Sequence, residues 1–74
     1  MEEGYSQKVI ALGQRIKNLR KEKGFTQFEL GVQCDVDIRT IQRIEAGEHN
    51  FGMHIFFAIA QILELPPEEL VKGL

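Results

Sequence analysis

Two helix starts lie so close together in this chain that the helix between them has to be short. Thr26 is followed by Glu29 three positions later, the capping-box pattern in which each side chain accepts a hydrogen bond from the other residue's backbone amide. Asp37 is a second good N-cap, and Asp35 tolerates the left-handed conformation that ends a helix. The pattern predicts a helix over residues 27–34 and another directly after Asp37. Two short helices with so tight a connection must cross steeply.

The remaining helices are predicted from apolar residues at helical spacing. One face of a first helix, which ends near Gly24, contains Val9, Leu12, Ile16 and Leu19. A fourth helix is predicted from Met53 to Leu65, ended by Pro66 and Pro67, and a short fifth helix follows. No segment alternates apolar and polar residues over the length of a strand. The expected fold class is therefore all-α, with five helices.

Length and composition fit one small domain. Of the 74 residues, 43% are hydrophobic and 27% charged, and we expect a single domain over residues 1–74 with a flexible N-terminal tail at residues 1–7. The longest apolar run, residues 55–60, is far shorter than the about 20 residues that cross a membrane. The first residues have no basic region ahead of an apolar stretch, so we expect no secretory signal. A single cysteine fits a reducing compartment, so we expect a cytoplasmic protein with no membrane contact.

The charges are unevenly distributed along the chain, although the net charge is only −2. Residues 8–43 contain eight basic and four acidic residues, whereas residues 44–74 contain one basic and five acidic residues. A domain with one side that faces an anion would show this asymmetry.

The third predicted helix has an outward face suited to nucleic acid. Its exposed positions would be Ile38, Arg39, Gln42 and Arg43, with Thr40 at the flank. In the major groove arginine pairs with guanine, glutamine pairs with adenine, and an apolar side chain contacts the methyl group of thymine. An ordinary solvated helix can also carry two arginines, so this face alone leaves both interpretations open.

The spacing over a longer stretch is similar to that of a known family. From Leu12 to Leu70 the chain resembles the helix-turn-helix domains of phage Cro and λ repressor, a family that includes restriction-modification controller proteins. The resembling segments align without insertion and are Arg15-Ile-Lys-Asn-Leu-Arg20, Gly24-Phe-Thr-Gln27, Glu29-Leu30, Val36, Thr40-Ile41, Ile44-Glu45-Ala-Gly47, Ile59-Ala60 and Leu63. The resemblance implies a compact five-helix, λ-repressor-like fold in which the second and third helices form the helix-turn-helix.

The resemblance also implies roles for individual residues. The residues that would contact base edges are Ile38, Arg39, Gln42 and Arg43, with Gln42 nearest the edge of the groove. The residues that would contact DNA phosphates are Lys17, Thr26, Gln27, Thr40 and Asn50. Arg20 and Glu45 match a partly buried ion pair that ties the first helix to the third.

Several positions depart from the family's pattern. Gly31 replaces the usual alanine where the second and third helices touch, which keeps the contact possible at a cost of about 1 kcal/mol in helix propensity. Asp35 replaces a turn glycine, and Cys34 replaces a core leucine. Because Ile38 replaces a contact that is commonly polar, the base preference cannot be copied from a relative.

The fourth predicted helix is apolar around most of its circumference. The face expected in the core contains Met53, Phe56, Phe57, Ala60 and Leu63, and it is widened by Ile55, Ala58, Ile59 and Ile62. Since so small a domain cannot bury both sides of this helix, we expect a homodimer whose interface includes Ile55, Ile62 and Leu74. A generously packed core with two exposed isoleucines remains the alternative.

Neither a metal site nor a catalytic site is indicated. Cys34, His49 and His54 are too few and too widely spaced for a zinc site, and no nucleophile stands with a base. We therefore expect no enzymatic activity, no cofactor and no small-molecule ligand. The sequence predicts a sequence-specific DNA-binding transcriptional regulator, a repressor that binds an inverted-repeat operator as a homodimer. The alternative is a protein-interaction module or antitoxin-like partner with little or no DNA binding.

Overall fold

Five helices make up the part of the chain that the structure describes. The structure, a computed structural model, describes residues 3–48 and 51–74. The helices within these residues are α1 (Glu3–Glu22), α2 (Gln27–Cys34), α3 (Ile38–Glu45), α4 (Met53–Ile62) and α5 (Glu68–Val71), with no strand among them. The all-α fold class predicted from the sequence is confirmed. None of these helices combines the length and the apolar character that crossing a membrane requires.

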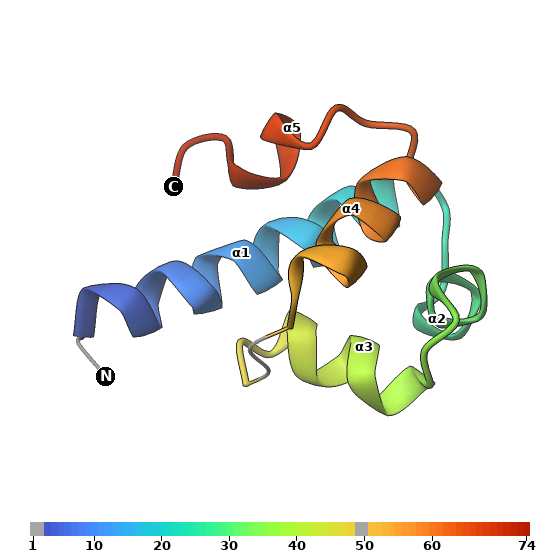
Figure 1. The fold of residues 1–74 in the computed structure, drawn as a ribbon, viewed down its shortest axis with the longest axis horizontal. Helices are drawn as coiled ribbons and strands as arrows, with labels where there is room; N and C mark the ends of the chain where they lie inside the picture. Colours follow the sequence, from blue (N-terminus) through green and yellow to red (C-terminus); the bar gives the residue numbers. More distant parts are fainter. Residues whose placement is uncertain (1–2, 49–50) are drawn as a thin grey trace.

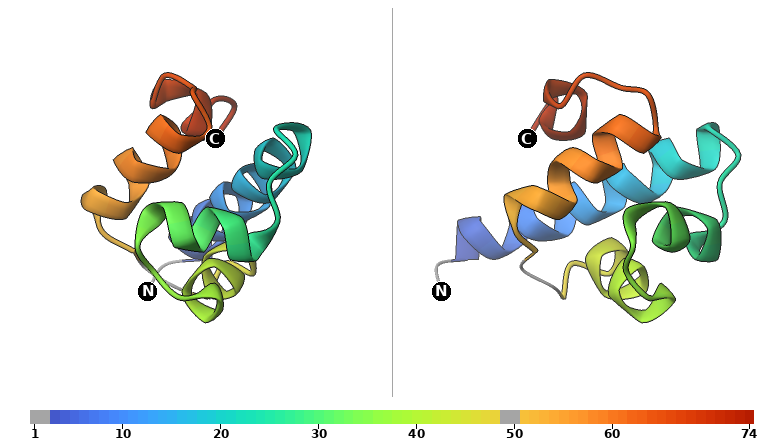
Figure 2. Two further views of the ribbon diagram at one scale, coloured as in Figure 1. Left: turned by 90° about the vertical axis from the view of Figure 1, so that its right-hand side faces the viewer. Right: turned by 45° about the vertical axis from the view of Figure 1, so that its right-hand side comes forward.

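The helices enclose one apolar core. α2 and α3 contact each other, α3 and α5 both contact α1, and α4 contacts α2. α3 and α5 lie on opposite sides of the long helix α1 (Figures 1 and 2). The buried residues of the core come from all parts of the fold and are Ile16, Leu19, Leu30, Cys34, Ile41, Ile44, Ile59, Ala60, Leu63 and Leu70.

Two glycines allow α1 to lie directly against the C-terminal end of α3. A Cβ atom at Gly13 would collide with the carbonyl oxygen of Ile44, a backbone atom that cannot rotate away. A Cβ atom at Gly47, two residues beyond the end of α3, would lie 2.7 Å from the Cα atom of Ile10. At Gly13 the two backbones are therefore in contact without an intervening side chain, and Gly47 leaves room for Ile10.

Each of the helices α1 to α4 is followed, within two residues, by a residue in the left-handed conformation. These residues are Gly24, Asp35, Gly47 and Glu64. After α4, the amide of Glu64 donates to the carbonyl oxygen of Gln61 at 3.1 Å, and the amide of Leu65 donates to that of Ala60 at 2.9 Å. This pair of bonds is the Schellman motif, which glycine forms without strain but glutamate does not, because its Cβ crowds the backbone at φ 57°.

Two boundaries differ from the sequence prediction. α4 ends at Ile62 instead of Leu65, because the left-handed turn at Glu64 stops it before Pro66 is reached. At the other end of the chain, α1 begins at Glu3, within the segment 1–7 that was expected to be a flexible tail.

The orientation of α4 about its own axis also differs from the prediction. Met53 and Phe57 were expected in the core, but 62% of Met53 and 49% of Phe57 is exposed. Ile59, which was expected only to widen that apolar face, is fully buried. A helix that is apolar all round carries no polar stripe to mark its solvent side, so periodicity could not fix this rotation.

The strained turn after α4 leads to a stability prediction. Glu64→Gly should raise the free energy of unfolding by about 1 kcal/mol, because glycine adopts the left-handed conformation without the Cβ penalty. Urea unfolding followed by circular dichroism measures the change. Glu64→Ala is the matched control, since alanine removes the carboxylate but keeps the Cβ; an equal gain in both variants would contradict the role assigned to the backbone.

Candidate nucleic-acid interface

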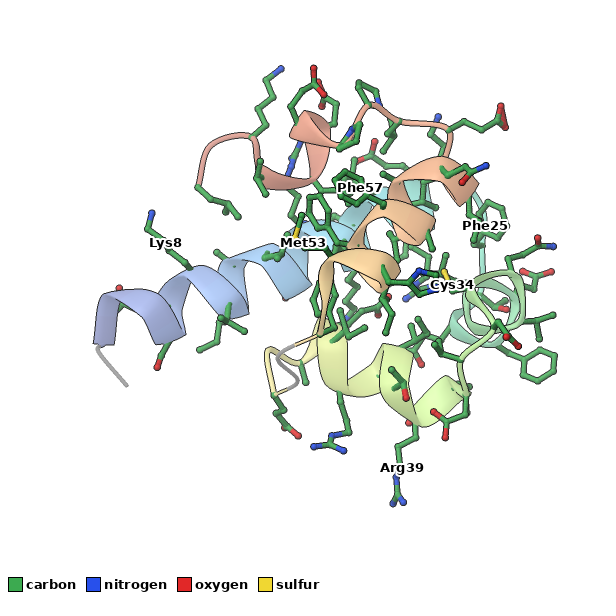
Figure 3. All side chains as sticks on the ribbon, in the orientation of Figure 1. Lys8, Phe25, Cys34, Arg39, Met53 and Phe57 are labelled. Carbon is green, nitrogen blue, oxygen red and sulfur yellow. The ribbon has the colours of Figure 1, made fainter. Side chains whose placement is uncertain are left out.

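α3 has one buried half and one exposed half. Ile41, Ile44 and Glu45 are buried against the other helices. The exposed half carries the four residues predicted to contact bases, which are Ile38, Arg39, Gln42 and Arg43. In Figure 3 the side chain of Arg39 extends away from the body of the protein, beyond α3. The structure thus brings these four residues together on one solvent-facing surface.

The start of α3 is held by the N-cap residue Asp37. Its Oδ1 atom accepts hydrogen bonds from the backbone amide of Thr40 at 2.9 Å and from the hydroxyl of Thr40 at 2.6 Å. These two bonds lower the pKa of Asp37 below its ordinary value, and the bond from the hydroxyl has the larger effect. Since the Thr40 hydroxyl donates to Asp37, its hydrogen is not available to a phosphate in this conformation.

The turn between α2 and α3 has the geometry that the sequence predicted. Asp35 is left-handed at φ 60°, and the amide of Val36 donates to the carbonyl oxygen of Gly31 at 2.9 Å. A Cβ atom at Gly31 would lie 3.0 Å from the carbonyl oxygen of Val36, so the small residue does allow the close contact. In Figure 1, α2 is seen almost along its axis while α3 runs across the view, which is the steep crossing of a helix-turn-helix.

The expected ion pair between Arg20 and Glu45 is present and buried. The Nε atom of Arg20 lies 2.6 Å from Oε2 of Glu45, and Nη2 lies 3.1 Å from Oε1. Only 7% of the Arg20 side chain and 3% of the Glu45 side chain is exposed. The Nη1 atom of Arg20 also donates to the carbonyl oxygen of Phe25 at 2.7 Å. The pair therefore joins the end of α1, the start of α2 and the buried half of α3.

Gln27 extends this buried network toward the exposed half of α3. Its Nε2 atom donates to Oε1 of Glu45 at 3.0 Å, and its Oε1 atom accepts from Nε2 of Gln42 at 3.4 Å. Sequence reasoning assigned Gln27 to a phosphate and did not foresee either contact, because both connect residues that only the crossing of α2 and α3 brings together.

The residues predicted to contact phosphates occupy different parts of the fold. Thr26 is the exposed N-cap of α2, and its hydroxyl oxygen accepts from the amide of Glu29 at 3.0 Å. Gln27 follows it, Lys17 is partly buried on α1, and Thr40 is partly buried on α3. Asn50 lies outside the residues that the structure describes.

The residues predicted at a dimer interface are not equally exposed. Ile55 and Ile62 are half-buried and pack against the core, whereas 37% of Leu74 is exposed. The most exposed apolar residues of α4 are Met53 and Phe57, which are one helical turn apart and lie along the same side of the helix (Figure 3).

The residues considered for a metal site are not arranged as one. Cys34 is buried in the core, and this burial raises the pKa of its thiol. His54 is exposed, and His49 lies outside the described residues. No group of three metal-ligating side chains occurs within residues 3–48 and 51–74.

The buried ion pair leads to a prediction with an internal control. Glu45→Ala should lower the free energy of unfolding by about 3–5 kcal/mol, because it leaves the Arg20 guanidinium buried without its partner. The half-exposed pair between Arg15 and Glu69, joined at 3.2 Å, provides the comparison. Glu69→Ala should cost about 1 kcal/mol or less. Chemical denaturation of both variants tests this, and similar losses would contradict the special role of the buried pair.

Comparison with known proteins supports the geometry described above. The helix-turn-helix family model HTH_3 matches residues 16–70. The structure is similar to the crystal structure of the restriction-modification controller protein C.AhdI from Aeromonas hydrophila, with a TM-score of 0.86 and 27% sequence identity. The superposition covers 89% of this chain and 96% of that protein. A comparison with curated proteins found no match.

The family match includes every element that builds the interface. It begins in α1, before Arg20, and continues through α2, α3 and α4 to Leu70 in α5. It therefore covers the ion pair, the tight turn and the exposed half of α3. The chain belongs to the helix-turn-helix family HTH_3 and is a DNA-binding transcriptional regulator.

Proposed function

We propose that this protein represses transcription by binding an inverted-repeat operator as a homodimer. The observation that carries the proposal is the exposed half of α3, where two arginines, a glutamine and an isoleucine share one solvent-facing surface. A short helix that exposes one half to solvent in this way fits into a major groove, which is about 12 Å wide. An occupied operator that overlaps a promoter would exclude RNA polymerase, and we expect this to occur in the cytoplasm.

The chemistry of this surface suits direct recognition of bases. Arg39 and Arg43 can each donate two hydrogen bonds to guanine, and Gln42 can donate to and accept from adenine. Ile38, which is 40% exposed at the start of α3, can contact the methyl group of thymine. Asp37 beside it adds a negative charge that disfavours close approach of a phosphate at that end.

Contacts to the DNA backbone would fix the orientation of α3. We propose that Thr26 and Gln27 approach a phosphate at the N-terminus of α2, where the helix dipole favours an anion. Lys17 on α1, Thr40 and Asn50 complete the proposed set. Thr40 would have to release its hydroxyl from Asp37 before it could donate to a phosphate.

We place the dimer interface at the exposed side of α4 and at the C-terminal residue. Met53, Phe57 and Leu74 are exposed apolar residues that a second copy would bury. Ile55 and Ile62, which were predicted at the interface, are half-buried and would pack between these exposed residues and the core. A twofold dimer places its two α3 helices about 34 Å apart, one turn of DNA, so the operator should be an inverted repeat.

The alternative, a protein-interaction module with little DNA binding, draws support from the same exposed apolar residues. The two possibilities separate in a titration of random duplex DNA at two salt concentrations. The affinity of a DNA-binding protein falls steeply with salt because counterions are released from the phosphates. An interaction module would show no measurable binding at either concentration.

The proposed readout predicts the effect of a substitution in α3. Arg43→Ala should weaken binding to a selected operator by about 1–3 kcal/mol and relax the preference at one base pair. Lys72→Ala is the control, since it removes an equal charge from an exposed residue beside α5, on the opposite side of α1 from α3 (Figure 1). Mobility-shift titrations measure both variants, and wild-type binding by Arg43→Ala would refute the assigned docking.

The proposed dimer predicts a selective effect at α4. Phe57→Ser should raise the dimer dissociation constant about tenfold or more, because a phenyl ring contributes about 1.5–3 kcal/mol when buried. Phe28→Ser on α2 removes a ring that is 63% exposed, and it should leave the constant unchanged. Sedimentation equilibrium tests both variants. Equal behaviour of the two would place the interface elsewhere.

A further inference from the structure

We propose that Asp37 determines specificity at one base pair, where its Oδ2 atom accepts a hydrogen bond from the amino group of a cytosine. The proposal rests on the proposed DNA-binding function and adds to it a base contact from a residue that precedes α3. It is carried by the way in which the two oxygens of the Asp37 carboxylate are used. One oxygen caps α3, and the other takes no part in this cap.

Asp37 lies at the end of α3 that a major groove would receive. It is the N-cap of this helix and directly precedes Ile38 and Arg39, the first two residues of the proposed base-contacting surface. All three residues are exposed. In a helix-turn-helix domain the N-terminal residues of the second helix contact base edges. We therefore expect the Asp37 carboxylate to lie beside a base pair.

The cap fixes the carboxylate but uses only one of its oxygens. The amide of Thr40 donates to Oδ1 of Asp37 at 2.9 Å, and the hydroxyl of Thr40 donates to the same atom at 2.6 Å. Two bonds to one oxygen hold the carboxylate in one orientation, because rotation about the Cβ–Cγ bond would lengthen both of them. The second oxygen, Oδ2, is thereby held in a defined place without being needed by the cap.

A carboxylate oxygen held at this place favours cytosine over the other bases. The carboxyl group of an aspartate is ionised at neutral pH, and the bonds from Thr40, the hydroxyl bond more than the amide bond, lower the pKa of Asp37 further. An ionised carboxylate only accepts hydrogen bonds. In the major groove cytosine offers the N4 amino donor alone, adenine places the N7 acceptor beside its N6 donor, and guanine offers two acceptors. Oδ2 therefore accepts from cytosine and repels guanine.

The cap itself does not require a carboxylate. Serine and asparagine cap helices about as well as aspartate does, without a second carboxylate oxygen. A negative charge near DNA also weakens binding, since it opposes the attraction between the basic residues and the phosphates. Because the helix dipole favours the charge at this end even without DNA, the measurement that separates the two roles is base preference and not stability.

The experiment is a selection of bound duplexes from a random library with four proteins: wild type, Asp37→Ser, Asp37→Asn and Asp35→Asn. Serine and asparagine both keep the cap of α3. Asp35→Asn removes an equal charge two residues earlier, at an exposed position whose left-handed conformation asparagine tolerates, and is the matched control. Wild type and Asp35→Asn should prefer cytosine over guanine by about tenfold or more at one base pair of each half-site.

The two substitutions of Asp37 should change this preference in different ways. Asp37→Ser removes the second oxygen, so it should lose the preference at that base pair and retain the others. In Asp37→Asn the side-chain oxygen has to accept the bonds from Thr40, so the NH2 group takes the place of Oδ2. Since this group donates, the preference should invert to guanine, whose groove edge only accepts. A residue that merely caps α3 would produce no such inversion.

A modified duplex tests the hydrogen bond itself. Replacing the selected cytosine with 2-pyrimidinone removes the amino group and keeps the rest of the base. Wild type should bind this duplex about tenfold more weakly than the cytosine duplex, whereas Asp37→Ser should bind both alike. Thermal unfolding of Asp37→Ser and Asp37→Asn should stay within a few degrees of wild type, because both keep the cap, and it separates a change in base preference from a loss of fold.

Each contrary outcome has its own meaning. If either Asp37→Ser or Asp37→Asn keeps the cytosine preference, Asp37 is only a helix cap and the proposal is wrong. If Asp35→Asn loses the same preference as Asp37→Ser, the effect comes from net charge and not from a contact, and the proposal is also wrong. If the wild type enriches no sequence, the proposed DNA-binding function itself fails, and this proposal fails with it.

Discussion

The buried ion pair between Arg20 and Glu45 is the interaction on which the rest of the structure depends. Placing two charges in the interior of so small a domain is costly unless both are fully hydrogen-bonded. Here the guanidinium bonds both carboxylate oxygens and the carbonyl oxygen of Phe25, while the carboxylate also accepts from Gln27. No buried side-chain polar atom among the described residues lacks a partner. Three helices are thereby fixed relative to one another by a single cluster of polar groups.

The solvent-facing surface of α3 follows from this arrangement and not from α3 alone. A helix of eight residues would be marginal in isolation, and α3 is held by the Asp37 cap, by the packing of Ile41 and Ile44, and by Glu45. Because the buried residues occupy one half of the helix, the polar residues occupy the other. The buried half of this short helix therefore holds the fold together, and the exposed half is left for the proposed contact with bases.

The parts of the fold that the sequence predicted well are those with local chemical signals. The capping box at Thr26, the cap at Asp37 and the left-handed turn at Asp35 each depend on neighbouring residues, and all three are present. The end of α4 was misplaced because glutamate at position 64 is a poor signal for a left-handed turn and two prolines follow closely. The rotation of α4 and the contact between Gln27 and Gln42 depend on how helices pack, which no local pattern encodes.

The glycines at positions 13 and 47 have a mechanical consequence. Most helices touch through side chains, which can change rotamer when one helix is displaced slightly against the other. At Gly13 of α1, by contrast, the main chain lies directly against the main chain of Ile44 and Glu45 in α3. Because no side chain separates the backbones at Gly13, a tilt of α1 would move this end of α3 with it. A ligand or partner that displaces α1 would therefore also change the orientation of α3.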